Sequence, residues 1–275
     1  MEEYVIKKVL NNNVVIAEKD SNEFVLVGKA IGFNTTKGTR LPEDKIENIF
    51  IKQSFKSKEN FNRVLQDING EIVGISEEII SLCEKELNVK INGAIHVSLP
   101  DHINFAITRA NEGIRIENPF LHELEALYSK EYVLAEKALN MINERFNVKL
   151  PNDEIGFICM HINAAIGEQE VGATLAYTKK IGEIMDFLYR LLGKAPDRGS
   201  LSYVRTITHL NFMIERVMNK KFIKNNLLDI IKKEFYNQYD IAIKIAIKME
   251  NLFSIKIPED EIGYIALHIN RIKEL

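Results

Sequence analysis

Asp153-Glu-Ile-Gly-Phe-Ile-Cys-Met-His-Ile-Asn163 returns 107 residues later as Asp260-Glu-Ile-Gly-Tyr-Ile-Ala-Leu-His-Ile-Asn270. A second stretch, His102-Ile-Asn-Phe-Ala-Ile-Thr-Arg109, returns at the same spacing as His209-Leu-Asn-Phe-Met-Ile-Glu-Arg216. The alignment needs no gap, since single residues also match: Asn118 with Asn225, Tyr132 with Tyr239, Phe146 with Phe253 and Pro151 with Pro258. A period of roughly 100 residues is too long for a solenoid repeat and has the size of an ordinary domain. The sequence therefore predicts a duplicated domain.

Helical periodicity dominates this part of the chain. Apolar residues recur at i, i+3 and i+4 over residues 77–87, 94–110, 131–146 and 154–165. This pattern is typical of helices that bury one face. Each copy is therefore expected to be a bundle of about five helices, and the two copies to join near residues 169–176.

The N-terminal segment has a different pattern. β-Branched residues are enriched over residues 4–10, 14–17 and 24–27, with turn signals at Asn11-Asn-Asn13 and Asp20-Ser-Asn22 between them. These features predict a small antiparallel sheet. A sheet domain of this size is marginally stable alone, so dimerisation is expected.

These patterns together predict a multidomain protein in which a small antiparallel β-sheet domain precedes two homologous all-α helical-bundle domains. The expected boundaries are a sheet domain at 1–54, a polar linker at 55–64, and helical domains at 65–170 and 171–275.

Composition excludes several classes of protein. The chain has 275 residues, of which 46% are hydrophobic, and its formal net charge is −3. No apolar run approaches the ~18 residues of a membrane span and no signal peptide is recognisable, so a cytoplasmic protein without membrane insertion is expected. The two cysteines, Cys83 and Cys159, lack CxxC spacing, which argues against disulfides and cysteine-bound zinc. The P-loop, GxGxxG and GxSxG patterns are absent as well, and we expect neither a cofactor nor an enzymatic activity.

Both copies place histidines beside charged residues. Glu154 and His161 are seven residues apart, as are His102 and Arg109, so each pair shares one helix face. Three interpretations remain open. The histidines can be core residues kept from an ancestral domain. They can bind a metal, although HExxH and i, i+4 pairs are absent, so no metal site is predicted. They can also accept a phosphoryl group on a ring nitrogen, which needs a partner for the other nitrogen and nearby positive charge.

The quoted features resemble one family. Lys7-Lys-Val-Leu-Asn-Asn-Asn-Val14 and Val27-Gly-Lys-Ala-Ile-Gly-Phe33, followed by two histidine-bearing helical repeats, resemble the sugar-operon transcriptional antiterminators of the BglG/LicT type. The resemblance covers essentially the whole chain. Asn118-Pro-Phe-Leu121 is most similar to the branch that serves the glucose permease operon.

The resemblance implies how the protein works. The sheet would be a co-antiterminator RNA-binding domain that binds, as a homodimer, a hairpin in the leader mRNA and prevents an overlapping terminator from forming. The helical domains would be regulation domains, PRD1 and PRD2, of the phosphoenolpyruvate-dependent sugar phosphotransferase system. The sugar permease (enzyme II) would phosphorylate PRD1 and inactivate the protein. The carrier protein HPr would phosphorylate PRD2, which activates many members of the family, although glucose-type members depend on it less.

The resemblance also implies site residues. The phosphorylation sites fall on four histidines: His102, His161, His209 and His268. The residues expected to support them are Asp101, Arg109, Glu154, Arg216 and Glu261. The RNA-contacting positions are Lys8, Asn11, Asn13, Gly28, Lys29 and Phe33. Asp101 precedes His102 whereas Thr208 precedes His209, so the two domains are expected to differ in phosphorylation rate.

The residue types at the proposed RNA-contacting positions are suited to binding unpaired bases. Bases in loops and bulges are recognised by stacking and by hydrogen bonds to their edges, which Phe33 and the amides of Asn11 and Asn13 can supply. Alternatively, the asparagines only form a turn and Phe33 only fills the core. Residues 1–54 hold eight basic and eight acidic residues, which predicts few phosphate contacts and a shallow salt dependence. Two rival functions are a DNA-binding activator with the same regulation domains, which would carry a helical N-terminus instead, and a histidine phosphotransfer protein.

Overall fold

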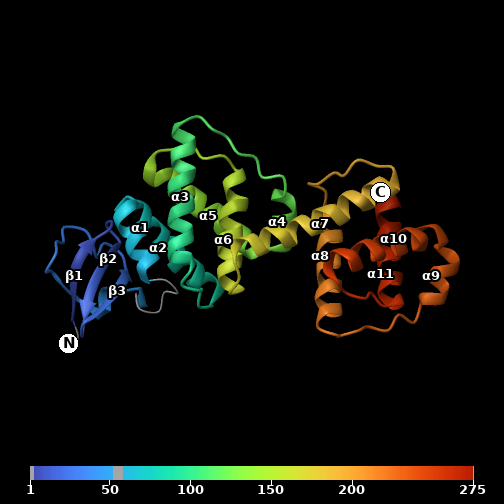
Figure 1. Cartoon of the computed structure of the whole chain (residues 1–275), viewed down its shortest axis with the longest axis horizontal. Helices are drawn as coiled ribbons and strands as arrows, with labels where there is room; N and C mark the ends of the chain where they lie inside the picture. Colours follow the sequence, from blue (N-terminus) through green and yellow to red (C-terminus); the bar gives the residue numbers. More distant parts are fainter. Residues whose placement is uncertain (1–2, 52–57, 275) are drawn as a thin grey trace. The chain divides into compact units, whose positions relative to one another are not determined.

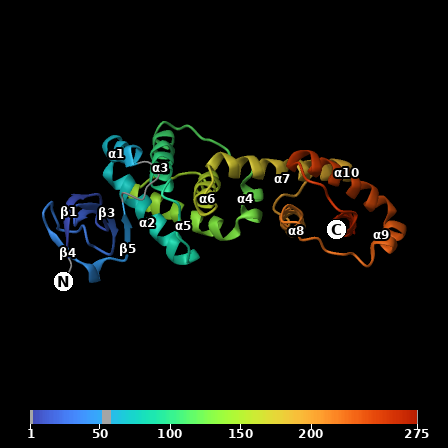
Figure 2. The same cartoon turned by 60° about the horizontal axis from the view of Figure 1, so that its bottom comes forward.

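The computed structural model describes residues 3–51 and 58–274. Its N-terminal part is an antiparallel sheet of five strands in the order β4-β1-β2-β3-β5 (Figures 1 and 2). The strands are β1 (Glu3–Val9), β2 (Val14–Lys19), β3 (Asn22–Val27), β4 (Arg40–Pro42) and β5 (Asn48–Ile51), with a 3-10 turn at Glu43–Lys45. The predicted strands and turns are therefore confirmed. The predicted domain boundary at residue 54 and the start of the linker at residues 55–57 lie outside the described residues.

Alternating residues of the strands form a small core. Ile6, Val15, Ala17 and Leu26 are buried on one face and contact each other and Leu41. The pairing register, with Val14 opposite Val27, places these side chains on the same face. A bulge between Ile6 and Lys8 shifts the register of β1 against β2.

The rest of the described chain is helical. The helices are α1 (Lys58–Asp67), α2 (Gly70–Leu87), α3 (Ile95–Asn111), α4 (Leu121–Leu127), α5 (Ser129–Phe146), α6 (Asp153–Ile166), α7 (Val171–Leu192), α8 (Leu201–Met218), α9 (Leu228–Glu234), α10 (Tyr236–Phe253) and α11 (Glu259–Glu274). The part of the predicted linker that the structure describes lies in α1. None of the described helices combines the length and apolar character needed to cross a bilayer.

The internal repeat is visible in the helices. Shifting α4 and α5 by 107 residues reproduces the bounds of α9 and α10, and the other helices of the first copy, α2, α3 and α6, correspond to α7, α8 and α11 within a few residues. Each copy thus has five helices, as predicted. The predicted junction at 169–176 includes the start of α7.

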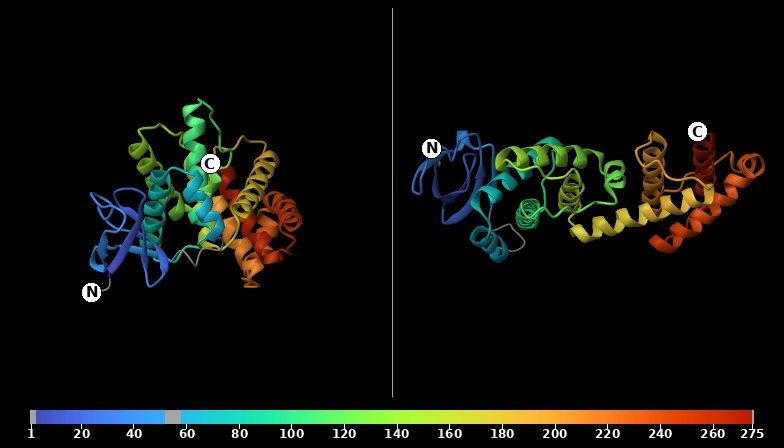
Figure 3. Two further views of the ribbon diagram at one scale, coloured as in Figure 1. Left: turned by 60° about the vertical axis from the view of Figure 1, so that its left-hand side comes forward. Right: turned by 90° about the horizontal axis from the view of Figure 1, so that it is seen from above.

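Contacts divide the chain into two compact units. The first comprises residues 1–119 and 130–174, and the second comprises residues 120–129 and 175–275, so that α4 packs with the second unit. In the second unit α8 and α11 lie side by side (Figure 3, right), and Ile207, Ile214 and Ile265 are buried between the helices.

Matched asparagines hold the last helix of each copy. The backbone N–H of Asn118 donates to Asp153 Oδ1 at 2.7 Å, and that of Asn225 donates to Asp260 Oδ1 at 3.0 Å. Each aspartate lies in the first turn of its helix, where a carboxylate is stabilised by the helix dipole. These bonds fix the ends of the two helices that carry His161 and His268.

Candidate functional site

The first copy brings its two predicted histidines together. His102 on α3 and His161 on α6 have ring centroids 5.0 Å apart. Burial, and secondly the charge of His102, lower the pKa of His161 to about 3, so this ring is neutral. Its Nδ1 lies 3.2 Å from the hydroxyl of Ser98. The arrangement offers a neutral imidazole whose ring nitrogens differ in environment, as an acceptor of a phosphoryl group requires.

A buried carboxylate links His102 to a guanidinium. Glu154 Oε2 lies 3.0 Å from His102 Nε2, an ion-pair distance without good hydrogen-bond alignment, and Glu154 Oε1 accepts a hydrogen bond from Arg109 at 2.8 Å. Burial raises the pKa of Glu154, but the contacts with His102 and Arg109 outweigh it and lower the pKa. We expected Asp101 to orient His102; Asp101 is exposed, and Glu154 is the carboxylate in contact with this ring.

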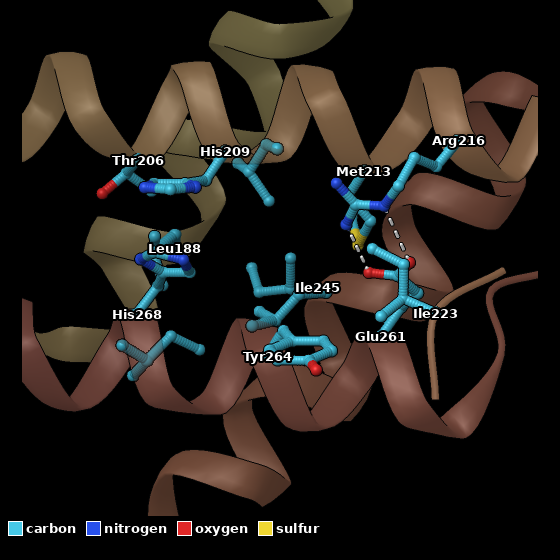
Figure 4. Close-up of a pocket in the computed structure, with 13 residues that line it drawn as sticks. Leu188, Thr206, His209, Met213, Arg216, Ile223, Ile245, Glu261, Tyr264 and His268 are labelled. Carbon is cyan, nitrogen blue, oxygen red and sulfur yellow. Dashed lines mark hydrogen bonds and ion pairs between the residues drawn. The ribbon is translucent and has the colours of Figure 1, made fainter. Parts of the chain in front are cut away.

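The second copy also has a histidine pair, but its glutamate and arginine make different contacts. His209 on α8 and His268 on α11 have ring centroids 4.0 Å apart. Arg216 binds Glu261 through two hydrogen bonds, Nε to Oε1 at 3.1 Å and Nη2 to Oε2 at 2.7 Å (Figure 4). Among the described residues no carboxylate lies within ion-pair distance of His209, whereas Glu154 contacts His102.

A cavity of about 340 Å³ separates this ion pair from the histidines. Figure 4 shows His209 and Arg216 projecting from one helix and His268 and Glu261 from the other. Burial, then His209 and Arg271, lower the pKa of His268 to about 4. Burial, followed by the charges of Arg271, Arg216 and Arg205, also lowers the pKa of His209. Both rings are therefore neutral near pH 7.

The predicted RNA contacts gather at the Asn11–Asn13 turn. The loop after β3 packs on this turn, with the N–H of Gly28 donating to the carbonyl of Asn13 at 2.9 Å. Asn13 Oδ1 accepts from the N–H of Ala30 at 3.0 Å. A Cβ atom at Gly28 would lie 2.4 Å from a backbone oxygen, so glycine is required for this close approach. Phe33 is 57% exposed, which excludes it from the core.

One residue at this turn was missed by the sequence analysis. Glu78 on α2 accepts hydrogen bonds from the amides of both asparagines, at 2.7 Å from Asn11 Nδ2 and 3.1 Å from Asn13 Nδ2. Arg145 lies 3.3 Å from the same carboxylate. Lys8 donates to the carbonyl of Leu65 at 2.9 Å. Glu78 is 65 residues from Asn13 in sequence, and no local pattern pointed to it.

The sequence is similar to that of known proteins along its whole length. The sequence matches the CAT RNA binding domain over residues 4–59 and the PRD domain over residues 77–165 and again over 184–272. It is 35% identical to the transcription antiterminator LicT of Bacillus subtilis, over 97% of this chain and 98% of the relative.

The chain belongs to the CAT–PRD family of transcription antiterminators.

Other proteins have a similar degree of sequence identity to this chain. Protein GlcT of Staphylococcus saprophyticus is 34% identical over 100% of this chain and 99% of its own length. The beta-glucoside operon antiterminator of Dickeya chrysanthemi is 30% identical over 98% and 96%. A crystal structure of GlcT CAT-PRDI matches with a TM-score of 0.50 and 38% identity, over 60% of this chain and 98% of that chain. Similarity to proteins named GlcT agrees with the glucose-operon branch inferred from Asn118-Pro-Phe-Leu121.

Family membership assigns the parts already described. The sheet is the CAT domain, α2–α6 form PRD1 and α7–α11 form PRD2. The structure brings together the two histidines within each PRD and five of the predicted RNA residues around one turn, whereas Lys8 lies on β1 and contacts Leu65.

Proposed function

We propose that this protein is a transcription antiterminator. As a homodimer its CAT domain binds a hairpin in the leader mRNA and thereby prevents an overlapping terminator from forming. The observation that carries this proposal is similarity along the full chain to antiterminators, with the CAT and both PRD segments present in order. In this proposal CAT occupies residues 1–54, and PRD1 and PRD2 occupy 65–170 and 171–275.

RNA binding is assigned to Phe33, whose ring is exposed, and to the amides of Asn11 and Asn13 at the neighbouring turn. The exposed ring of Phe33 can stack on an unpaired base, and the amides of Asn11 and Asn13 can bond to base edges. The test is a gel-shift assay with leader hairpins from sugar-uptake operons of the source genome. Phe33→Ala should weaken binding about tenfold, as loss of one stacked base does, and Asn11→Ala should weaken it through loss of a hydrogen bond to a base edge. Phe222→Ala, which truncates a ring of similar exposure in PRD2, should leave binding unchanged.

Control of the activity is assigned to the paired histidines. The sugar permease would phosphorylate His102 or His161 and inactivate the protein, and HPr would phosphorylate His209 or His268, which activates many members of the family and is needed less by glucose-type members. The neutral rings of His161 and His268 support this assignment, because a phosphoryl acceptor needs an unprotonated nitrogen. A phosphate would bring about −1.5 to −2 charges to a contact between helices, enough to shift its packing.

The switch is tested by phosphotransfer in vitro. The full chain is incubated with phosphoenolpyruvate, enzyme I and HPr, with and without permease, and acid-labile phosphate is mapped by mass spectrometry. Single His→Ala variants should each remove one phosphate, while His122→Ala should remove none. Absence of phosphate from all four histidines would exclude this mode of regulation and leave RNA binding to be judged by the gel shift.

A further inference from the structure

A second cavity beside the PRD2 histidines is lined by cations. Its volume is about 590 Å³, and both His209 and His268 reach it. The other charged residues in its lining are Lys194, Arg205, Arg271 and Asp197. Three permanent cations against one carboxylate give this cavity an excess of positive charge next to two neutral imidazoles.

Helix geometry places the two arginines beside the rings. Arg205 lies four residues before His209 on α8, and Arg271 lies three residues after His268 on α11, so each arginine neighbours its histidine on one helix face. Both guanidinium groups contribute to the lowered pKa of His209, in agreement with this placement. Both residues are exposed, and within the described part of the chain neither is paired with a carboxylate.

PRD1 lacks these arginines. The residues 107 positions earlier are Ser98 and Ala164. They line the corresponding cavity at His161, of about 550 Å³, whose charged residues besides the histidine are Glu168 and Glu170. Position 98 touches the ring in PRD1, since Ser98 Oγ lies 3.2 Å from His161 Nδ1. The duplicated domains therefore present opposite charge to equivalent histidines.

We propose that Arg205 and Arg271 form a phosphate-binding site that receives the phosphoryl group transferred to the His209–His268 pair, and that PRD1 has no equivalent of this site. This inference rests on the proposed phosphorylation of PRD2 and adds the residues that bind the phosphoryl oxygens. Guanidinium groups suit this role because they form paired, charge-assisted hydrogen bonds to phosphate.

The phosphoryl group comes from a phosphohistidine of a donor protein. The N–P bond of the donor breaks as the lone pair of an unprotonated ring nitrogen in PRD2 attacks phosphorus and forms a new N–P bond. The acceptor ring loses the proton from its other nitrogen, and the donor imidazole takes up one proton. The phosphoryl group remains a dianion throughout, so the arginines stabilise both the transfer and the phosphorylated product.

The experiment uses the full chain with His102→Ala and His161→Ala, so that only the PRD2 histidines of the four can accept phosphate. In this background Arg205→Ser and Arg271→Ala introduce the PRD1 residues, alone and together. Two quantities are measured with HPr as donor: the initial rate of phosphate incorporation, and the equilibrium between phosphorylated HPr and phosphorylated PRD2. The double variant should lower both about tenfold or more, as expected for loss of charge-assisted bonds. Arg205→Lys with Arg271→Lys should restore part of each.

Controls separate this inference from the proposed function. Arg190→Ala removes an exposed arginine of α7 outside the cavity and should change neither quantity. Far-UV circular dichroism and thermal unfolding check that the variants fold. A lower rate with an unchanged equilibrium would overturn the inference, because the arginines would then only attract the donor. Equal values in the parent and the double variant would also overturn it, whereas no phosphate on the unmutated chain would instead refute PRD2 phosphorylation itself.

Discussion

The carboxylate of Glu78 binds two side chains of the CAT domain at once. Asn11 and Asn13 direct their amide N–H groups to its two oxygens, and Glu78 is largely buried beside Arg145. An amide that donates to a carboxylate cannot donate the same hydrogen to a base. If these asparagines contact RNA through the hydrogens that now point to Glu78, the RNA must first displace this carboxylate.

Glu78→Gln is therefore expected to raise RNA affinity. The substitution keeps the size of the side chain but leaves one acceptor oxygen where the two asparagine amides now use two, and it removes the charge assistance, so the competing contact weakens. We expect Kd for the leader hairpin to fall about three- to tenfold, as measured by gel shift or fluorescence anisotropy. Glu86→Gln, on the same helix, is the control for the change in net charge. Unchanged or weaker binding by Glu78→Gln would show that this carboxylate does not compete with RNA.

At the scale of the element, helix α2 approaches the CAT turn through a glycine. A Cβ atom at Gly74 would lie 2.4 Å from Asn11 Nδ2, an atom already held by Glu78. Alanine favours the helical conformation over glycine by about 1 kcal/mol. The helix thus has glycine where close approach requires it, at a cost to its own stability.

Gly74→Ala should separate the turn from α2 while leaving the helix intact. The added methyl group displaces the Asn11 amide, so RNA affinity should rise in the same direction as in Glu78→Gln. The double variant should bind little better than either single variant, since both break one contact. Gly172→Ala, whose Cβ would meet no atom within 4 Å, is the matched control. Additive gains in affinity would mean that the two residues act through different contacts.

The CAT sheet itself leaves few cations for phosphate. Lys7 is paired with Glu18 and Arg40 with Glu3, within the domain whose charges balance overall. With about three phosphate contacts, affinity should fall less than about 50-fold between 50 and 200 mM salt. Anisotropy titrations across this range measure the slope. A much steeper decline would mean that backbone contacts, rather than base and shape recognition, dominate binding.

At the scale of the whole molecule, each PRD holds a histidine whose pKa lies well below the ordinary value, so its imidazole stays neutral in mildly acidic solution. The pKa is about 3 for His161 and about 4 for His268 because both are buried near a second histidine. In the unfolded chain a histidine titrates near 6.5. Below that value the unfolded chain binds more protons than the folded one, so the free energy of unfolding decreases as the pH falls from about 6.5 toward the folded pKa.

Urea unfolding at pH 7.5 and pH 5.0 tests this dependence. Each of the two histidines should contribute a loss of up to about 2 kcal/mol at pH 5. His268→Gln should reduce the difference between the two pH values, because glutamine does not titrate. His122→Gln controls for loss of an imidazole outside the pairs. Identical pH dependence in the parent and His268→Gln would show that the pair does not limit stability in acid.

The sequence alone determined the duplication, the fold class and the four repeated histidines, whose pairing in space came from the tertiary structure. Helical periodicity and an ungapped repeat are local properties of the chain, and they predicted helices that the structure reproduces, such as α5 and its counterpart α10. Spacing also showed that His102 shares a helix face with Arg109.

Tertiary structure decided which of these faces meet. It placed Glu154 against His102 and Arg109, while in the other copy Arg216 took both oxygens of Glu261. It also brought Glu78 to the CAT turn. Periodicity fixes the side of a helix on which a residue lies, but the packing of several helices and a sheet decides which side chain it contacts. For this reason two copies with matching motifs have histidines in different electrostatic surroundings.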